Sequence, residues 1–226
     1  MTLPFTPIQA CLFDLDGTLV DSLRDIAESM NAVLHRHHVP THPVEAYNTF
    51  VGDGMIALAE RAWPTELRDS SINMLDLVEE MKQEYANRWQ NHSTPYPGIE
   101  SMLTACASRG MNLGVLSNKP DAFTKKMVTH FFPDIPFSIV RGAREGVPVK
   151  PDPTSAREIQ QEWGLSPSSI AYIGDTDTDM KTGCSAGFTT IGVSWGFREP
   201  DELLAQGAQC VVDFPSELSQ ILSNRT

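Results

Sequence analysis

The chain has 226 residues, 41% of them hydrophobic and 20% charged, which is typical of a globular protein with one domain or a core domain and a smaller companion. Its formal net charge is −12, which argues against nucleic acid as the main partner because nucleic-acid binding needs a basic surface. No apolar run reaches the roughly 18 residues of a membrane span, and the opening segment MTLPFTPIQACLFDLDG lacks the basic and apolar regions of a secretory signal.

The cysteines are far apart and have no CxxC spacing, which indicates reduced and mostly buried thiols. They are Cys11, Cys106, Cys184 and Cys210. We therefore expect a cytoplasmic protein that binds neither membranes nor nucleic acids.

Short apolar runs, several of which end in small or polar residues, predict strands covered on both faces. The runs are Ile8–Phe13, Leu113–Leu116, Phe137–Val140, Ile170–Ile173, Thr190–Val193 and Cys210–Val212. Helical spacing of apolar residues appears between most of them, at 23–34, 99–106, 123–131 and 159–163. This alternation predicts an α/β fold with a doubly wound parallel sheet, whose site lies at the carboxyl ends of the strands.

The segment 20–92 breaks the alternation, because it has helical patterns and no convincing strand. Apolar residues line one face over 55–63 and another over 77–89. We expect a small all-helical cap inserted after the first strand. The predicted domains are a core of residues 1–19 and 93–226 and a cap of residues 20–92.

Two acids interrupt the first strand pattern, in the segment CLFDLDGTLVDS that begins at Cys11. Asp14 and Asp16 lie two positions apart, so on a strand their side chains share a face, with about 7 Å between the Cα atoms. Burying a carboxylate is costly unless its charge is compensated, and a second carboxylate adds to the cost. An ordinary turn after a strand, of the kind that Asp-Gly often forms, remains an alternative for this segment alone. Gly17 permits a tight turn, and Thr18 offers a hydroxyl.

Further polar residues follow other predicted strands. The segment GDTDTD places Asp175 and Asp179 four positions apart, so a helical turn would align them, whereas Asp177 between them is expected to face solvent. Taken alone, these acids could simply cap a helix. Lys150 precedes Pro151 and is held in an extended conformation, although by itself it would be an ordinary surface lysine.

Ser117 could cap the next helix, or it could present its hydroxyl and nearby N–H groups to an anion. Because strand ends meet at one edge of a parallel sheet, we expect Ser117, Lys150 and both acid pairs to form one site. Two unit charges about 4 Å apart repel by about 4 kcal/mol at an effective dielectric constant of about 20, so the clustered carboxylates need a cation. The ligands are oxygens, without histidine or cysteine, and this predicts Mg²⁺.

Four segments, in this order, resemble the four motifs of the haloacid dehalogenase superfamily of hydrolases: DLDGTLVDS, the serine of LSNK, the lysine of VKPDP, and GDTDTD. The helical insert resembles the C1 cap of that superfamily. Within it, the chain is most similar to phosphoglycolate phosphatases, through the PYPGI turn, the SNKP stretch and the segment GDGMIALAERA. The resemblance implies a Rossmann-like core and a Mg²⁺-dependent phosphomonoester hydrolase, monomeric or homodimeric, that acts on a small phosphorylated metabolite. Phosphoglycolate is the leading substrate.

The resemblance also implies a role for each matching residue. Asp14 would be the nucleophile that forms an aspartyl-phosphate, and Asp16 would protonate the leaving group and then accept a proton from water. Mg²⁺ would bind the Asp14 carboxylate, the Asp16 backbone carbonyl and Asp175. Asp179 would hold water molecules or Lys150, which balances the anionic charge. The substrate phosphate would bind Thr18, Ser117 and the backbone of Asn118.

Other functions of similar proteins fit the sequence less well. Sugar phosphomutases of the β-phosphoglucomutase type carry a histidine soon after the first motif, whereas the first histidine here is His35. A phospho-acceptor signalling module would be much shorter and would lack an acid two residues after the nucleophile, as Asp16 is. Haloacid dehalogenases and phosphonatases also lack that second acid. Inorganic pyrophosphate remains open as a substrate.

The cap is expected to set specificity. Asp53 and Gly54 belong to a flexible turn that could close on the site, and Arg61 could reach a substrate carboxylate. Against this, Asp53 would repel an anion, and an arginine on a helix usually faces solvent. His35 and its neighbour His37 do not share a helical face, so a metal site there is disfavoured.

One stretch departs from the phosphoglycolate phosphatases, which usually have an acidic Gly-Asp-Asp segment before the third-motif lysine. This chain has RGAREGVPVKPDP instead. Arg141, Arg144 and Glu145 could alter the rim of the site, but we expect them to face solvent.

Overall fold

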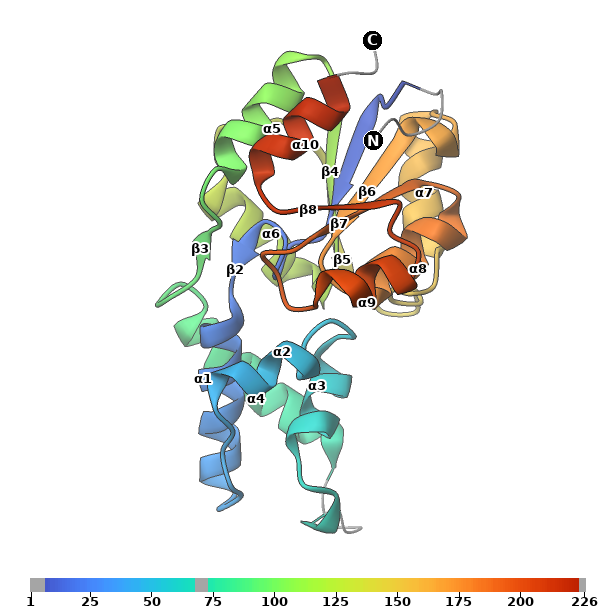
Figure 1. The fold of residues 1–226 in the computed structure, drawn as a ribbon. Coiled ribbons are helices and arrows are strands. Elements are labelled where there is room, and N and C mark those ends of the chain that lie inside the picture. Colours follow the sequence, from blue (N-terminus) through green and yellow to red (C-terminus); the bar gives the residue numbers. More distant parts are fainter. Residues whose placement is uncertain (1–6, 68–72, 224–226) are drawn as a thin grey trace.

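A computed structural model describes residues 7–67 and 73–223, and it shows a sheet domain joined to a helical cap (Figure 1). Six strands form one sheet in the order β5-β4-β1-β6-β7-β8, and every neighbouring pair is parallel. The strands are β1 (Ala10–Phe13), β4 (Asn112–Pro120), β5 (Phe137–Ala143), β6 (Ile170–Gly174), β7 (Thr189–Val193) and β8 (Cys210–Val212). The predicted parallel sheet is confirmed.

Some predictions concern residues outside the described part. The prediction that the opening segment is no secretory signal rests in part on residues 1–6, which lie outside the described part. Residues 68–72 of the predicted cap and residues 224–226 of the predicted core also lie outside it. Among the helices that the structure describes, none is long and apolar enough to cross a membrane.

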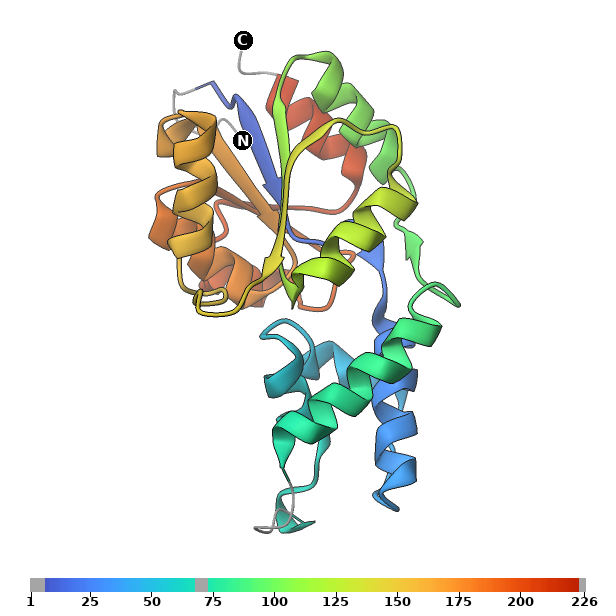
Figure 2. The same cartoon turned by 180° about the vertical axis from the view of Figure 1, so that it is seen from behind.

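Helices cover both faces of the sheet (Figures 1 and 2). Side chains of β1 alternate between the faces: Cys11 and Phe13 join the core under one set of helices, and Ala10 and Leu12 join the core under the other. The first set is α5 (Ile99–Ser108), α6 (Asp121–Phe131) and α10 (Pro215–Ser223). The second is α7 (Thr154–Trp163) and α8 (Asp177–Ala186), with α9 (Pro200–Ala205) beside α8 and the short η3 (Pro167–Ser169) before β6. Burial on both faces explains why the strand patterns are continuous rather than alternating.

The cap lies below the sheet in Figure 1. Its main contact joins α1 and α4, and α3 packs against α4. Leu58 and Ala62 of α3 and Met81 and Tyr85 of α4 are buried, as their helical spacing predicts. The cap elements are α1 (Leu23–Arg36), η1 (Val44–Ala46), α2 (Tyr47–Phe50), α3 (Met55–Ala62), η2 (Thr65–Leu67) and α4 (Met74–Arg88).

Two short strands form the connection between sheet and cap. β2 (Val20–Asp21) pairs antiparallel with β3 (Thr94–Pro95), so the expectation that 20–92 contains no strand is wrong at its first two residues. The chain crosses twice between the domains at this place, and the two extended backbones lie side by side and bond to each other. A two-residue strand is too short to leave a periodic pattern in the sequence. We propose these crossings as the domain limits.

A buried acid fixes the same connection. The carboxylate of Asp25, on α1, is fully buried and accepts hydrogen bonds from the backbone N–H groups of His92 and Ser93, at 2.8–3.1 Å. The Ser93 hydroxyl donates to it as well, at 2.7 Å. Asp25 thereby ties the outgoing chain to the returning chain.

The four cysteines form no disulfide bonds in the part of the chain that the structure describes. Cys11 and Cys106 are buried, as expected, and Cys210 is half-buried. Cys184 is exposed, so the prediction of a mostly buried set holds only in part. It lies on α8, which packs against β6 and β7, and its thiol donates to the Gly207 carbonyl at 3.4 Å.

Candidate active site

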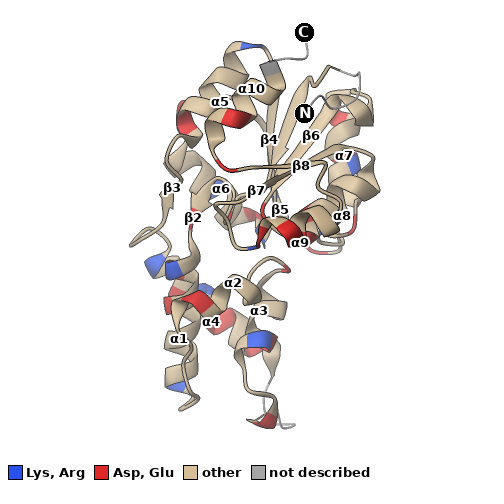
Figure 3. Cartoon of the chain, in the orientation of Figure 1, with Lys and Arg blue, Asp and Glu red and all other residues tan. Residues whose placement is uncertain are grey.

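The carboxyl ends of the central strands meet at the edge of the sheet that faces the cap, where acidic residues gather (Figure 3). Asp14 and Asp16 follow β1, Asp175 follows β6, and Ser117 lies in the second half of β4. The N–H group of Asp14 donates to the carbonyl of Ile173 at 2.9 Å, which extends the β1–β6 pairing up to the site. Topology therefore brings together the separate segments that the sequence predicts as one site.

Asp14 is 5% exposed and faces one cation. Lys150 Nζ lies 2.8 Å from Asp14 Oδ1, close enough for an ion pair, although that oxygen lacks a partner in hydrogen-bond geometry. Burial raises the pKa of Asp14 to about 7, against the lowering influence of Lys150. The nearby charges of Asp179 and Asp16 contribute to this increase. One lysine therefore does not balance the negative charge around Asp14.

Asp179 holds Lys150 in place. Its Oδ1 accepts a hydrogen bond from Lys150 Nζ at 2.7 Å, and its Oδ2 accepts bonds from the N–H and hydroxyl groups of Thr176 at 3.1 and 2.7 Å. The bond from the Thr176 N–H, together with the bond that the Thr176 hydroxyl accepts from the Asp179 N–H at 3.3 Å, forms a capping box at the start of α8, which fixes the carboxylate. Asp179 thus both caps the helix and orients Lys150. Asp177 is half-buried and pairs with Lys181 instead of facing solvent alone, because the two lie four residues apart on α8.

Asp175 is fully buried in a close-fitting cradle. Its carboxylate accepts hydrogen bonds from the Thr18 hydroxyl at 2.6 Å and from the Phe197 N–H at 2.9 Å. A Cβ atom at Gly17 would lie 2.2 Å from Asp175 Oδ2, and one at Gly196 would lie 2.2 Å from Asp175 Cβ. Burial raises the pKa of Asp175, and the charges of neighbouring carboxylates add to this. The Thr18 hydroxyl is engaged with Asp175 here, and its contact with a substrate phosphate stays a prediction.

Three of these carboxylates are spaced to share an ion. Asp14, Asp175 and Asp179 each offer an oxygen, and these atoms lie within 4.8 Å of one another. The donors are oxygens alone, which suits a hard cation such as Mg²⁺. Burial is the main cause of the raised pKa values of both Asp14 and Asp175, and the negative charges of the neighbouring carboxylates add to it. The residues present fit the predicted metal.

Asp16 has a cation of its own, which the sequence reasoning missed. Lys119 Nζ lies 2.9 and 2.8 Å from the two carboxylate oxygens of Asp16, and the Ser22 hydroxyl also donates to this carboxylate. The ammonium group lies 4.4 Å from the centre of the Tyr85 ring, on the cap. Burial alone would lower the pKa of Lys119, but the charge of Asp16 raises it above its ordinary value. In the sequence, Lys119 lies two residues after Ser117 at the same strand end, and this position could have indicated that it belongs to the site.

Asn118 connects three parts of the site. Its side-chain amide donates to the carbonyls of Lys150 at 2.9 Å and Gly52 at 3.0 Å, and it accepts from the Lys150 N–H at 2.8 Å. Ser117 is buried beside it, and its hydroxyl accepts from the Lys119 N–H at 3.2 Å. The side chain of Asn118 therefore positions Lys150 and contacts the cap. Phosphate binding by Ser117 and by the Asn118 backbone stays a prediction.

The cap residues Asp53 and Arg61 bind each other. Arg61 forms an ion pair with Asp53 and donates to the Phe50 carbonyl at 3.1 Å. The other oxygen of Asp53 accepts from the Thr178 hydroxyl on α8, so Asp53 links cap and core. Arg198 adds a second link by donating to the Val51 carbonyl at 3.0 Å. Neither Asp53 nor Arg61 lines the cavity, whereas Gly54 does, and substrate contacts by these three residues stay predictions.

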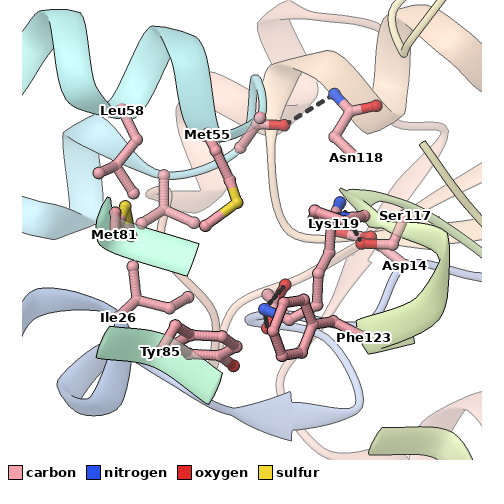
Figure 4. A pocket seen from close by; sticks show the side chains of 15 residues that line it. Asp14, Ile26, Met55, Leu58, Met81, Tyr85, Ser117, Asn118, Lys119 and Phe123 are labelled. Atoms are coloured by element: carbon pink, nitrogen blue, oxygen red, sulfur yellow. Dashed lines mark hydrogen bonds and ion pairs between the residues drawn. The ribbon is translucent and has the colours of Figure 1, made fainter. Parts of the chain in front are cut away.

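A small cavity, partly open to solvent, lies between the cap and the strand ends. Figure 4 shows the cap side chains on one side of it and Asp14, Ser117 and Lys119 on the other. Apart from glycines, the cap residues within the described part of the chain that line this cavity have apolar or aromatic side chains: Ile26, Val51, Met55, Leu58, Met81 and Tyr85. Asp14 and Asp16 thus face an apolar wall.

The prediction that Arg141, Arg144 and Glu145 face solvent is correct only for Glu145. The Arg141 side chain is 14% exposed and pairs with Glu162 on α7 at 2.6 Å. Arg144 is half-buried and pairs with Glu158 on the same helix at 2.5 Å. Glu158 and Glu162 lie on α7, which packs beside β4. Both arginines therefore form ion pairs with this helix and are partly shielded from solvent.

Comparisons with known proteins agree with this architecture. A sequence profile described as haloacid dehalogenase-like hydrolase matches residues 11–193. A phosphoglycolate phosphatase from Mannheimia succiniciproducens is 33% identical over 191 residues, which are 82% of this chain and 85% of that enzyme. An N-acetylmuramic acid 6-phosphate phosphatase from Pseudomonas aeruginosa is 30% identical over 220 residues, with 95% of each chain covered.

Solved structures give the same picture. A crystal structure from Lactobacillus delbrueckii subsp. bulgaricus, which carries a provisional phosphoglycolate phosphatase name, superposes with a TM-score of 0.87 at 26% identity and covers 96% of this chain and 99% of its own. A haloacid dehalogenase-like hydrolase from Streptococcus pneumoniae shares the fold, with a TM-score of 0.83 at 22% identity over 93% and 96% of the two chains. The chain therefore belongs to the haloacid dehalogenase-like hydrolase family.

Proposed function

We propose that the chain is a Mg²⁺-dependent phosphomonoester hydrolase that acts through an aspartyl-phosphate. The observation that carries this proposal is the buried Asp14, whose carboxylate lies beside Lys150 and within reach of the Asp175 and Asp179 carboxylates. A second acid, Asp16, lies two residues further on and lines the same cavity. This arrangement suits a nucleophile and a proton donor that act on one substrate.

The steps follow from these positions. An Asp14 oxygen attacks phosphorus, the bond to the ester oxygen breaks, and Asp16 gives its proton to the departing alkoxide. Asp16 then accepts a proton from a water molecule that attacks the phosphorus of the aspartyl-phosphate, which releases phosphate and restores Asp14. Lys150, held by Asp179, balances the charge on the transferring group. Ser117 and the Asn118 backbone bind its oxygens.

Asp14, Asp175 and the backbone carbonyl of Asp16 would hold the ion, and Asp179 would act from just outside them through Lys150 or water. When bound, Mg²⁺ supplies positive charge that reduces the repulsion between the carboxylates and the phosphate. We also propose that the protein works in the cytoplasm, as a monomer or a homodimer.

Two substrate classes are candidates. Phosphoglycolate comes first by likeness, because that substrate appears in the names of relatives at about 30% identity. A sugar phosphate is the second candidate. The relative from Pseudomonas aeruginosa is named for the phosphate of an amino-sugar acid, so its name supports a leaving group larger than glycolate but not an uncharged one. The preference for a less charged leaving group rests on the apolar cap wall alone.

The test is phosphate release from a panel of small phosphomonoesters, measured with Mg²⁺ and with EDTA, for the native chain and Asp14→Asn. We expect turnover that needs Mg²⁺ and a phosphate adduct on Asp14, detected by mass spectrometry after acid quenching. The asparagine variant should release no phosphate. Turnover that survives in Asp14→Asn would remove Asp14 from the role of nucleophile.

A further inference from the structure

The cap side of the cavity offers no free charge to a substrate. Met55, Leu58 and Met81 face the catalytic acids there, with Tyr85 alongside (Figure 4). Among the described cap residues that line the cavity, none is charged. A leaving group bound in this cavity therefore lies against carbon and sulfur atoms.

The charged groups closest to this wall already have partners. Arg61 is paired with Asp53 and bonded to the Phe50 carbonyl, outside the cavity lining. Lys119 does line the cavity, but its ammonium group lies against both carboxylate oxygens of Asp16 and over the ring of Tyr85. Neither cation is available to a substrate unless it leaves a buried or partly buried partner.

The core side of the cavity repels a second anion. Asp14 and Asp16 both line it, and the leaving group must lie next to them when the phosphoryl group is in place. A carboxylate on the leaving group would meet these acids on one side and the apolar wall on the other. Burying a carboxylate without a partner costs free energy, so such a substrate binds more weakly than a neutral one of the same size.

The aromatic residues of the cavity suit the face of a sugar ring. The rings of Tyr85 and Phe123 meet edge to face, with their centres 5.4 Å apart, and both line the cavity. The Tyr85 hydroxyl donates to the sulfur of Met127 in the core at 3.4 Å, and Lys119 lies over the Tyr85 ring. The half-buried Phe123 is therefore the aromatic side chain more open to a ligand. Such surfaces bind C–H groups through apolar contact.

We propose that the enzyme selects phosphomonoesters of neutral, sugar-sized alcohols and discriminates against leaving groups that carry a carboxylate. This selection rests on the proposed phosphomonoesterase function. Of the two substrate classes above, it favours the sugar phosphates over phosphoglycolate. Met55, Leu58 and Met81 are the residues that set the preference, together with Tyr85.

The first test compares substrates that differ by one carboxylate. The pairs are 2-hydroxyethyl phosphate with phosphoglycolate, and glycerol 3-phosphate with 3-phosphoglycerate. With Mg²⁺ present, kcat/KM should be about tenfold or more higher for the neutral member of each pair. The value of kcat/KM should be higher for glucose 6-phosphate and N-acetylglucosamine 6-phosphate than for 2-hydroxyethyl phosphate. Equal or faster hydrolysis of the carboxylates would overturn the inference and leave the proposed function standing, whereas no hydrolysis of any phosphomonoester would overturn both.

The second test adds the missing charge. Met55→Lys places a cation on the wall with a side chain of similar length, and it should raise kcat/KM for phosphoglycolate relative to 2-hydroxyethyl phosphate about tenfold. Leu75→Lys is the matched control, because Leu75 is 62% exposed on α4 and does not line the cavity. The control should leave the ratio unchanged. If Met55→Lys is folded and the ratio does not move, the wall does not set the preference.

Discussion

Lys119 Nζ lies 2.8 Å from Asp16 Oδ2, and both side chains are almost completely buried, at 7% and 10% exposure. The pair joins the end of β4 to the loop after β1, beneath the Tyr85 ring of the cap. Burying two charged groups costs desolvation free energy that their mutual attraction offsets. Removal of one partner therefore leaves the other as an uncompensated buried charge, which destabilises the fold. Asp16 therefore depends on Lys119 for its charge balance.

We predict that Lys119→Met destabilises the protein by about 3 kcal/mol, because the Asp16 carboxylate loses its buried counter-charge. It should also lower kcat, since Asp16 loses a contact that orients it. Chemical denaturation and phosphate release measure the two effects. Lys125→Met is the control: Lys125 is 59% exposed and pairs with Asp121 on the surface, so stability should change by no more than about 0.5 kcal/mol. Equal stability of both variants would contradict the prediction.

Asp16→Asn should separate the two halves of the reaction. The variant can neither protonate the leaving group nor accept a proton from water, so steady-state turnover should fall by about a hundredfold or more. With p-nitrophenyl phosphate, whose leaving group needs no protonation, attack by Asp14 should persist. Rapid-quench kinetics should then show a burst of p-nitrophenol followed by slow turnover. A native steady-state rate would remove Asp16 from its assigned role.

The continuous apolar runs predict the parallel sheet because a strand covered on both faces must be apolar throughout, as Ala10–Phe13 is. Sheet topology then predicts the site, since the ends of parallel strands meet whatever lies between them in sequence. Asp14 and Asp175 are brought together in this way. The cluster of carboxylates therefore follows from the backbone topology, which the pattern of apolar residues predicts.

Pairings between side chains were harder to predict. Lys119 and Asp16 are 103 positions apart. The position of Lys119 beside Ser117 indicates that it lies near the site, but it does not indicate that Lys119 and Asp16 form a buried pair. Arg141 was expected to face solvent, but it pairs with Glu162. Asp25 looks like an ordinary acid in the first turn of a helix, and its burial depends on the returning chain at 92–93. Such contacts depend on how elements pack, which apolar periodicity does not describe.

Asp25 should be the main stabilising residue of the connection between cap and core. In Asp25→Ala, the buried N–H and hydroxyl donors of Ser93 and the N–H of His92 lose their acceptor, at about 1–3 kcal/mol for each group left unpaired. We expect a total loss of about 3–5 kcal/mol and faster hydrogen exchange at residues 92–93. Asp21→Ala in the adjacent strand β2 is the control, because that side chain is exposed. Native-like exchange at 92–93 in Asp25→Ala would show that other contacts hold the connection.

Gly17→Ala should disrupt the metal site through one methyl group. Gly17 has φ = +85°, and a Cβ atom there would lie 2.2 Å from Asp175 Oδ2, so the carboxylate must move. Gly146 is a matched control, because its φ of +72° imposes the same backbone strain while a Cβ atom would meet nothing within 4 Å. Gly146→Ala should therefore cost only the strain of a left-handed alanine, about 1 kcal/mol, and leave Mg²⁺ binding unchanged. For Gly17→Ala we expect Mg²⁺ affinity, measured by calorimetry, to fall about tenfold or more because a protein ligand is displaced. Equal Mg²⁺ affinity in the two variants would mean that the position of Asp175 does not determine metal binding.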